Sequence, residues 1–203
     1  GCRIPVDFDF ASWPIGYVPN SWNTEQPELF YYEGSVVYVR DFPWYDGTDD
    51  LGSEQSKPSA SSSDRVFLRF GGVQYLTHVF LNGTHVGTHS GGSTPFCVEA
   101  TSELKNENRL IVSVNNRREM HRVPSENFDW FNYGGIYRGV ELIRVPHRFI
   151  RNFEVQQAPG GAAGRIRARV WVDDSRETGG ANDGADGNTN DAEVARVEIA
   201  ELG

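Results

Sequence analysis

The strongest constraint on the fold is the stretch Arg65–Phe96, RVFLRFGGVQYLTHVFLNGTHVGTHSGGSTPF, in which apolar and polar residues alternate on both sides of Asn82-Gly83. Alternation with a period of two is typical of strands with one buried face. Asn-Gly most readily adopts the positive φ angles of a tight two-residue turn, so the stretch predicts a β-hairpin. Such a turn pairs Leu81 with Thr84 and predicts which side chains share a face of the hairpin. The face toward the core is predicted to carry Val79, Leu81 and Val86. The opposite face is predicted to carry His78, Phe80, His85 and His89.

Similar alternation predicts further strands at Val66–Phe70, Ser35–Phe42, Arg109–Asn115 and Gly139–Val145. The segment VPNSWNTEQPE, by contrast, has a helix-breaking residue every few positions and is expected to be an ordered loop rather than a helix. Many short strands separated by turn signals are typical of antiparallel sandwiches. The sequence therefore predicts an all-β fold, with a jelly-roll-type β-sandwich over residues 1–146.

A second unit is expected from residue 147 to residue 203. Strands are predicted at Arg165–Val172, Phe149–Gln156 and Val194–Ile199, and the Gly/Asn/Asp tract at 177–191 is expected to be disordered. Three strands are fewer than the roughly seven of an immunoglobulin-like sandwich. The second unit is therefore predicted to be a partial domain. The polar tract at 46–64 is expected to be a surface insertion of the first domain.

The charge distribution excludes two classes of partner. The last 27 residues hold seven acidic residues against one arginine, a net charge of −6 out of −9 for the whole chain. The rest of the chain has neither the basic stripe that nucleic-acid binding requires nor a basic amphipathic helix for membranes. No apolar run reaches transmembrane length, and the first residues are not a signal peptide. Neither nucleic acid nor a membrane is expected as a partner.

No metal or cofactor is expected either. His85 and His89 lie four residues apart on one strand, too far for a shared ion, and His78 with His89 would supply only two ligands. Cys97 lies in an apolar run and is expected to be a buried thiol. Asn82-Gly83-Thr84 matches the N-glycosylation pattern, although the hairpin turn explains the same residues.

Five segments, in order, are similar to a known family: VPNSWN, YYEGSVVYVRDF, VFLNGTHVGTHSGGSTPF, NRLIVSVNNR and DWFNYGGIYRGVELI. They resemble the amino-terminal sugar-binding domain of the family-2 glycoside hydrolases. The segment Asp129–Arg138 looks most like the β-glucuronidase branch. Residues after Pro146 are similar to the start of the immunoglobulin-like second domain of the family.

This resemblance implies a three-domain retaining glycosidase, in which a TIM barrel holding two catalytic glutamates follows the two sandwiches. A barrel takes about 250 residues, and too few follow Pro146 to form one. The chain, which begins with Gly rather than Met, is therefore expected to be a fragment and inactive alone. Its expected partners are the catalytic barrel of the same polypeptide and, through it, a β-glycoside. The oligomeric state and the compartment stay open.

The resemblance also implies a sugar site in the loop Asp129–Tyr133. In the family the matching aspartate contacts sugar hydroxyls, so Asp129 is the first candidate, followed by Trp130, Asn132 and Tyr133. A carboxylate accepts hydrogen bonds from two neighbouring hydroxyls, and aromatic rings offer flat faces to a sugar. The aromatic residues are equally explained as core or interface residues. Arg138 is expected to anchor the loop.

Three alternatives are weighed against the enzyme fragment. A catalytic pair of Glu126 and Asp129 within this chain is not expected, because a local loop rarely gives such a pair rigid support. A free-standing carbohydrate-binding module of lectin type would use the same loop without a barrel. A structural adhesion module would have no sugar site at all.

Overall fold

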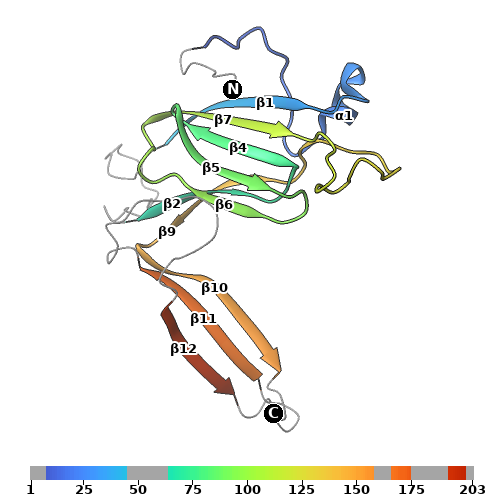
Figure 1. Cartoon of the computed structure of the whole chain (residues 1–203). Coiled ribbons are helices and arrows are strands. Elements are labelled where there is room, and N and C mark those ends of the chain that lie inside the picture. Colours follow the sequence, from blue (N-terminus) through green and yellow to red (C-terminus); the bar gives the residue numbers. More distant parts are fainter. Residues whose placement is uncertain (1–7, 45–63, 158–165, 175–191, 200–203) are drawn as a thin grey trace. The chain divides into compact units, whose positions relative to one another are not determined.

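The computed structural model describes residues 8–44, 64–157, 166–174 and 192–199, and their regular secondary structure is almost entirely strands (Figure 1). The chain separates into two compact units, one reaching to Arg144 and the other starting at Val145. The predicted all-β fold is confirmed. No helix among the described residues has the length and apolar character needed to cross a bilayer.

Unit 1 is a β-sandwich of two main sheets (Figure 1). The larger sheet has the order β1-β7-β4-β5 and consists of Ser35–Pro43, Glu107–Asn115, Leu76–Leu81 and Thr84–Ser90. The smaller sheet has the order β6-β2-β9 and consists of Phe96–Glu99, Arg65–Phe70 and Val140–Val145. The two-residue strands β3 (Val73–Gln74) and β8 (Gly135–Ile136) form an additional antiparallel pair.

The core lies between the two main sheets, as the alternation predicted. On β2 every second residue is buried, and Leu68 and Phe70 reach the core. Val79 and Leu81 on β4 reach the same core from the other sheet, as do the apolar residues of β7. The stacking of Phe70 on Phe96, with ring centroids 4.8 Å apart, joins β2 to β6 within this core. Alternate burial on facing strands is what makes this a sandwich rather than a single open sheet.

The hairpin forms at Asn82-Gly83, with φ angles of 52° and 90°, but its predicted register is wrong beyond the first two pairs. Leu81 lies opposite Thr84, whereas Val79 lies opposite Gly87 because Val86 is an extra residue in β5. This β-bulge places a glycine where a Cβ would approach Val98 Cγ1 to 2.3 Å. The site has no room for a valine, which accounts for the shift.

The bulge also moves His89 to the opposite face from the predicted one. His89 lies opposite the fully buried Thr77, and its ring stacks on Phe96 with centroids 4.2 Å apart. A shift of one residue sends every following side chain to the other face. Burial accordingly lowers the pKa of His89.

Two further predictions in unit 1 are wrong. The segment predicted as a loop contains a single helical turn, α1 (Trp22–Glu25), and a 3-10 turn, η1 (Pro27–Leu29). A helix of one turn is too short to produce a periodic pattern. Cys97 is exposed rather than buried, because it lies opposite Arg69 on the outer face of the smaller sheet while its neighbour Val98 faces the core.

Unit 2 contains a three-stranded antiparallel sheet in the order β10-β11-β12, formed by Arg148–Gln157, Ile166–Asp174 and Ala192–Ile199. All three predicted strands are present. Ile150, Phe153 and Val155 on β10 are exposed and lie opposite apolar residues of β11. The assignment to a partial immunoglobulin-like domain stays a prediction, and the tracts at 46–64 and 177–191 lie almost wholly outside the described residues.

Replacing Asn82 separates the two contributions of this residue to stability. Its amide group donates to the Glu103 carbonyl and to Asn108 Oδ1, and its oxygen accepts from the Arg109 amide. Asn82→Ala should lower the free energy of unfolding by roughly 2–4 kcal/mol, because the variant loses these three side-chain bonds and because alanine tolerates a positive φ less well than asparagine. Asn82→Gly keeps the φ angle and should cost about 1 kcal/mol less. Denaturant unfolding measures both, and equal losses would contradict a contribution from backbone conformation.

Candidate functional site

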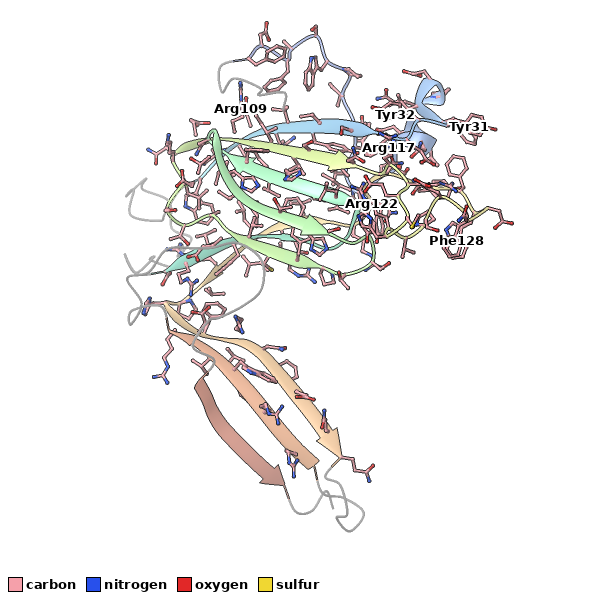
Figure 2. All side chains as sticks on the ribbon, in the orientation of Figure 1. Tyr31, Tyr32, Arg109, Arg117, Arg122 and Phe128 are labelled. Atoms are coloured by element: carbon pink, nitrogen blue, oxygen red, sulfur yellow. The ribbon has the colours of Figure 1, made fainter. Side chains whose placement is uncertain are left out.

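The residues assigned to the sugar site lie on the long connection between β7 and β8, at one end of unit 1 (Figure 2). This connection has no regular structure because its backbone bonds to side chains and to other loops rather than to a neighbouring strand. Asp129, Trp130 and Tyr133 are exposed, the last two by 53% and 52%. Asn132 is only 4% exposed. Three of the four candidates are thus accessible from solvent.

Exposed aromatic rings from two distant segments meet at this end of the unit. Tyr31 follows η1, and its ring lies 6.2 Å from that of Phe131, which in turn lies 4.6 Å from Tyr133. Phe30 joins them, with its ring 4.9 Å from Phe131. We refer to Phe30, Tyr31, Phe131 and Tyr133 as the aromatic patch. Sequence reasoning proposed Tyr133 but missed Phe30 and Tyr31, which lie about a hundred residues earlier in the chain.

Phe128 and Trp130 form a separate stacked pair beside Asp129. Their ring centroids are 4.6 Å apart at an angle of 15°, so both side chains lie on the same side of the backbone. Asp129, between them in the chain, is exposed. Among the described residues none forms a hydrogen bond or ion pair with its carboxylate.

Buried asparagines hold the two segments of the site together. Asn23, which is 1% exposed, donates to the carbonyls of Leu29, Phe30 and Tyr32 at 2.8–3.1 Å. Its own oxygen accepts a 2.8 Å bond from the Gly134 amide. One side chain thus ties the loop after η1 to the end of the Asp129 loop. A buried amide with all its bonds made fixes the backbone around it.

Asn132 belongs to a second set of such bonds. Its amide donates to the Asn116 carbonyl, while its oxygen accepts from Gln74. Asn116, itself 1% exposed, donates to the Asn132 carbonyl and accepts from the Gly34 amide at 2.9 Å. The side chain of Asn132 is therefore engaged within the protein. Its bonds join the Asp129 loop to β3 and to the residues at the end of β7.

Gly134 permits the close approach of the loop to the core. A Cβ at this position would lie 2.1 Å from the ring of the buried Trp22. Gly135 has a φ of 130°, a backbone conformation that favours glycine. The hydroxyl of Tyr38 lies beneath it, and burial raises the pKa of Tyr38 to about 12, so this phenol stays neutral.

The loop is anchored by an arginine other than the predicted one. Arg138 approaches the carbonyls of Gly71 and Ser93, outside the loop, at 3.5 Å. Arg118 instead donates to the carbonyls of Phe128 and Trp130, the residues on either side of Asp129. No local pattern in the sequence marked Arg118. Its role depends on contacts made ten and twelve residues later in the chain.

The histidines also group differently from the prediction. His78 Nδ1 and His85 Nε2 lie 2.9 and 3.0 Å from the same Thr88 hydroxyl, on the outer face of the larger sheet. Burial, followed by the proximity of His85, lowers the pKa of His78. Within the described part of the chain, no group of three or more His, Cys, Asp or Glu residues could hold a metal ion.

Comparisons with known proteins agree with the geometry of unit 1. The family described as glycosyl hydrolases family 2, sugar binding domain, matches residues 16–146. A β-glucuronidase of Felis catus is 26% identical over 77% of the chain and 26% of its own length. A β-glucuronidase of Bacteroides fragilis is 32% identical over 62% of the chain and 17% of its length.

A solved structure supports the same relationship. The β-glucuronidase of Bifidobacterium dentium complexed with coumarin-3-O-glucuronide is 25% identical, with a TM-score of 0.64 over 77% of this chain and 30% of that one. The chain thus spans about a quarter or less of the curated relatives described above. It corresponds to a limited part of these longer proteins.

Removal of Asn23 should destabilise unit 1 more than its small volume suggests. Asn23→Ala leaves three partly buried carbonyls and the buried Gly134 amide without their partner and should lower the free energy of unfolding by about 2–5 kcal/mol. Asn127→Ala is the matched control, because Asn127 is exposed in the same region of the unit, and should change stability by less than about 0.5 kcal/mol. Urea denaturation measures both variants. Equal effects would show that the buried amide network contributes little.

Proposed function

Because the chain belongs to glycosyl hydrolase family 2, through its sugar-binding domain, we propose that it is the non-catalytic amino-terminal part of a β-glucuronidase-like hydrolase. In this proposal a catalytic barrel of the same polypeptide cleaves the glycosidic bond. The chain contributes Asp129 to the sugar site of that barrel. The described residues supply strands and two short turns, whereas a barrel takes about 250 residues of alternating strands and helices.

The observation that carries this proposal is the environment of Asp129. Its carboxylate is exposed, and no described residue bonds to it, although the loop beneath it is held by buried side chains. A carboxylate that is fixed in position but retains its acceptor capacity suits a ligand rich in hydroxyl groups. A β-glucuronide is such a ligand.

The other candidates take different parts in the proposed site. Trp130, the chain neighbour of Asp129, and Tyr133 present exposed rings that are suited to the apolar face of a sugar or to the surface of the barrel. Asn132 is proposed to act indirectly, because its amide bonds to Asn116 and Gln74 hold the loop from below.

A free-standing carbohydrate-binding module is the second candidate function. It is favoured by the exposure of the aromatic patch, since Tyr31 is 85% exposed and Phe30 43% exposed. Exposed rings next to a free carboxylate could bind a sugar without a barrel. Calorimetric titration of the chain with a glucuronide separates the two functions. Saturable binding that is lost in Asp129→Ala supports the free-standing module. If the titration gives no heat of binding, the result supports the proposal that the chain is part of a hydrolase.

Asp129→Ala should lower kcat/KM of the intact hydrolase for an aryl β-glucuronide by a factor of about 10–150, because a hydrogen bond to a charged group contributes roughly 1.5–3 kcal/mol. Glu126→Ala is the matched control, since Glu126 is also an exposed carboxylate of this loop, and should retain wild-type kcat/KM. Steady-state fluorimetric kinetics measures both. Wild-type kinetics in Asp129→Ala would remove Asp129 from the sugar site, and a loss in Glu126→Ala would show that Glu126 also contributes.

A further inference from the structure

We propose that Arg118 is the positioning residue of this site, which fixes Asp129 by binding the backbone on both of its sides. The inference rests on the proposed function of Asp129 and adds a residue that neither the sequence pattern nor the comparisons single out. Arg118 Nη1 donates to the Phe128 carbonyl, and Nη2 donates to the Trp130 carbonyl at 2.8 Å. The two donors of one planar group thus straddle Asp129.

Glu33 fixes the guanidinium group itself. Arg118 Nε lies 2.8 Å from Glu33 Oε1, and the Arg118 amide donates to Glu33 Oε2 at 3.2 Å. The two side chains are 21% and 32% exposed, so the ion pair is partly shielded from water. A partly buried pair with bonds to both carboxylate oxygens has a defined geometry, unlike a fully exposed pair.

The ion pair connects the loop to the rigid part of unit 1. Glu33 precedes Gly34, whose amide and carbonyl both bond to Asn116 at the end of β7. Arg118 follows Asn115, the last residue of the same strand, by three residues. The carbonyls on either side of Asp129 are therefore linked through one guanidinium to the edge strand β1 and to β7.

The chemistry of arginine suits this task. Its five N–H donors lie in one plane, so a single side chain can reach one carboxylate and two carbonyls at once. Glutamine at this position lacks the charge and cannot make all three of the side-chain bonds. Loss of Arg118 should therefore release the Phe128–Trp130 backbone while leaving the Asn116–Asn132 bonds in place.

A positioning role predicts a specific pattern of kinetics. Small displacements of a group that binds the transition state lower the rate strongly, and an error of 1 Å can cost about a hundredfold. Arg118→Gln should accordingly lower kcat/KM of the intact hydrolase for an aryl β-glucuronide by about tenfold. In a variant that lacks the Asp129 carboxylate, Arg118 has no group to position, so its loss should not lower kcat/KM further. The double variant Asp129→Ala/Arg118→Gln should therefore have the same kcat/KM as Asp129→Ala alone.

Arg109→Gln is the matched control for loss of an arginine. Arg109 lies at the other end of β7 (Figure 2) and resembles Arg118 in its bonds. Its guanidinium pairs with Asp41 at 2.8 Å and donates to the Phe8 carbonyl. It is 24% exposed, close to the value for Arg118. Arg109→Gln should retain kcat/KM within about twofold, while thermal unfolding reports whether the two variants lose similar stability.

The experiment is steady-state kinetics of the wild type, the three single variants and the double variant. A tenfold loss in Arg118→Gln that disappears in the Asp129→Ala background supports the inference. A further loss in the double variant, or the same loss in Arg109→Gln, would overturn it in favour of a general structural effect. If Asp129→Ala itself retains wild-type kinetics, the proposed function of Asp129 fails first, which distinguishes the two failures.

Glu33→Gln keeps the experiment decisive if Arg118→Gln does not fold. It preserves the size and one acceptor of the Arg118 partner but removes the charge. A smaller loss of kcat/KM, about threefold, that again vanishes in the Asp129→Ala background supports the same inference. Wild-type kinetics in a folded Glu33→Gln variant would show that the ion pair does not position Asp129.

Discussion

Buried backbone groups without strand partners set the main constraint on the loop end of unit 1. The loops after η1 and after β7 contain backbone N–H and C=O groups that no neighbouring strand pairs, and such groups need other partners wherever they are shielded from water. Asn23 and Asn116 supply the missing partners, each with an amide that both donates and accepts. An unpaired buried polar group costs about as much as a lost hydrogen bond. The asparagines therefore determine which loop conformations are stable.

The packing of the sandwich core determines the register of the hairpin formed by β4 and β5. Gly87 lies opposite Val79 because Val98 leaves no space for a side chain there. The bulge at Val86 accommodates the mismatch, and it sends His89 inward onto Phe96. Close packing of a few core side chains thus assigns whole strands to their faces.

The candidate site combines a rigid base with an accessible surface. Exposed rings and an unpaired carboxylate lie above a layer of satisfied amides and one partly shielded ion pair. This division of roles is physically coherent, because a group that must bind a ligand needs free acceptors while its backbone must not move. Exposure and order are therefore supplied by different residues: Asp129 and Tyr133 at the surface, Arg118 and Asn132 below.

The sequence by itself determined the features that depend on local rules. The alternation of apolar and polar residues predicted β1, β2, β7 and β11, and the dipeptide Asn82-Gly83 predicted the hairpin turn. Both patterns are readable in the sequence because strand periodicity and turn φ angles are properties of neighbouring residues. The motif around Asp129 likewise located the exposed part of the candidate site. Its resemblance to a known family identified the fold before any contact was known.

Only the tertiary structure decided the features that depend on residues far apart in the chain. The bulge at Val86, the exposure of Cys97 and the helical turn at Trp22 each follow from packing against another strand or loop. Arg138 was expected to anchor the loop, yet the anchor is Arg118, which depends on Glu33, 85 residues earlier. The physical reason is that a long polar side chain such as arginine can reach many possible hydrogen-bond acceptors. Which acceptors lie within hydrogen-bonding distance depends on the tertiary structure.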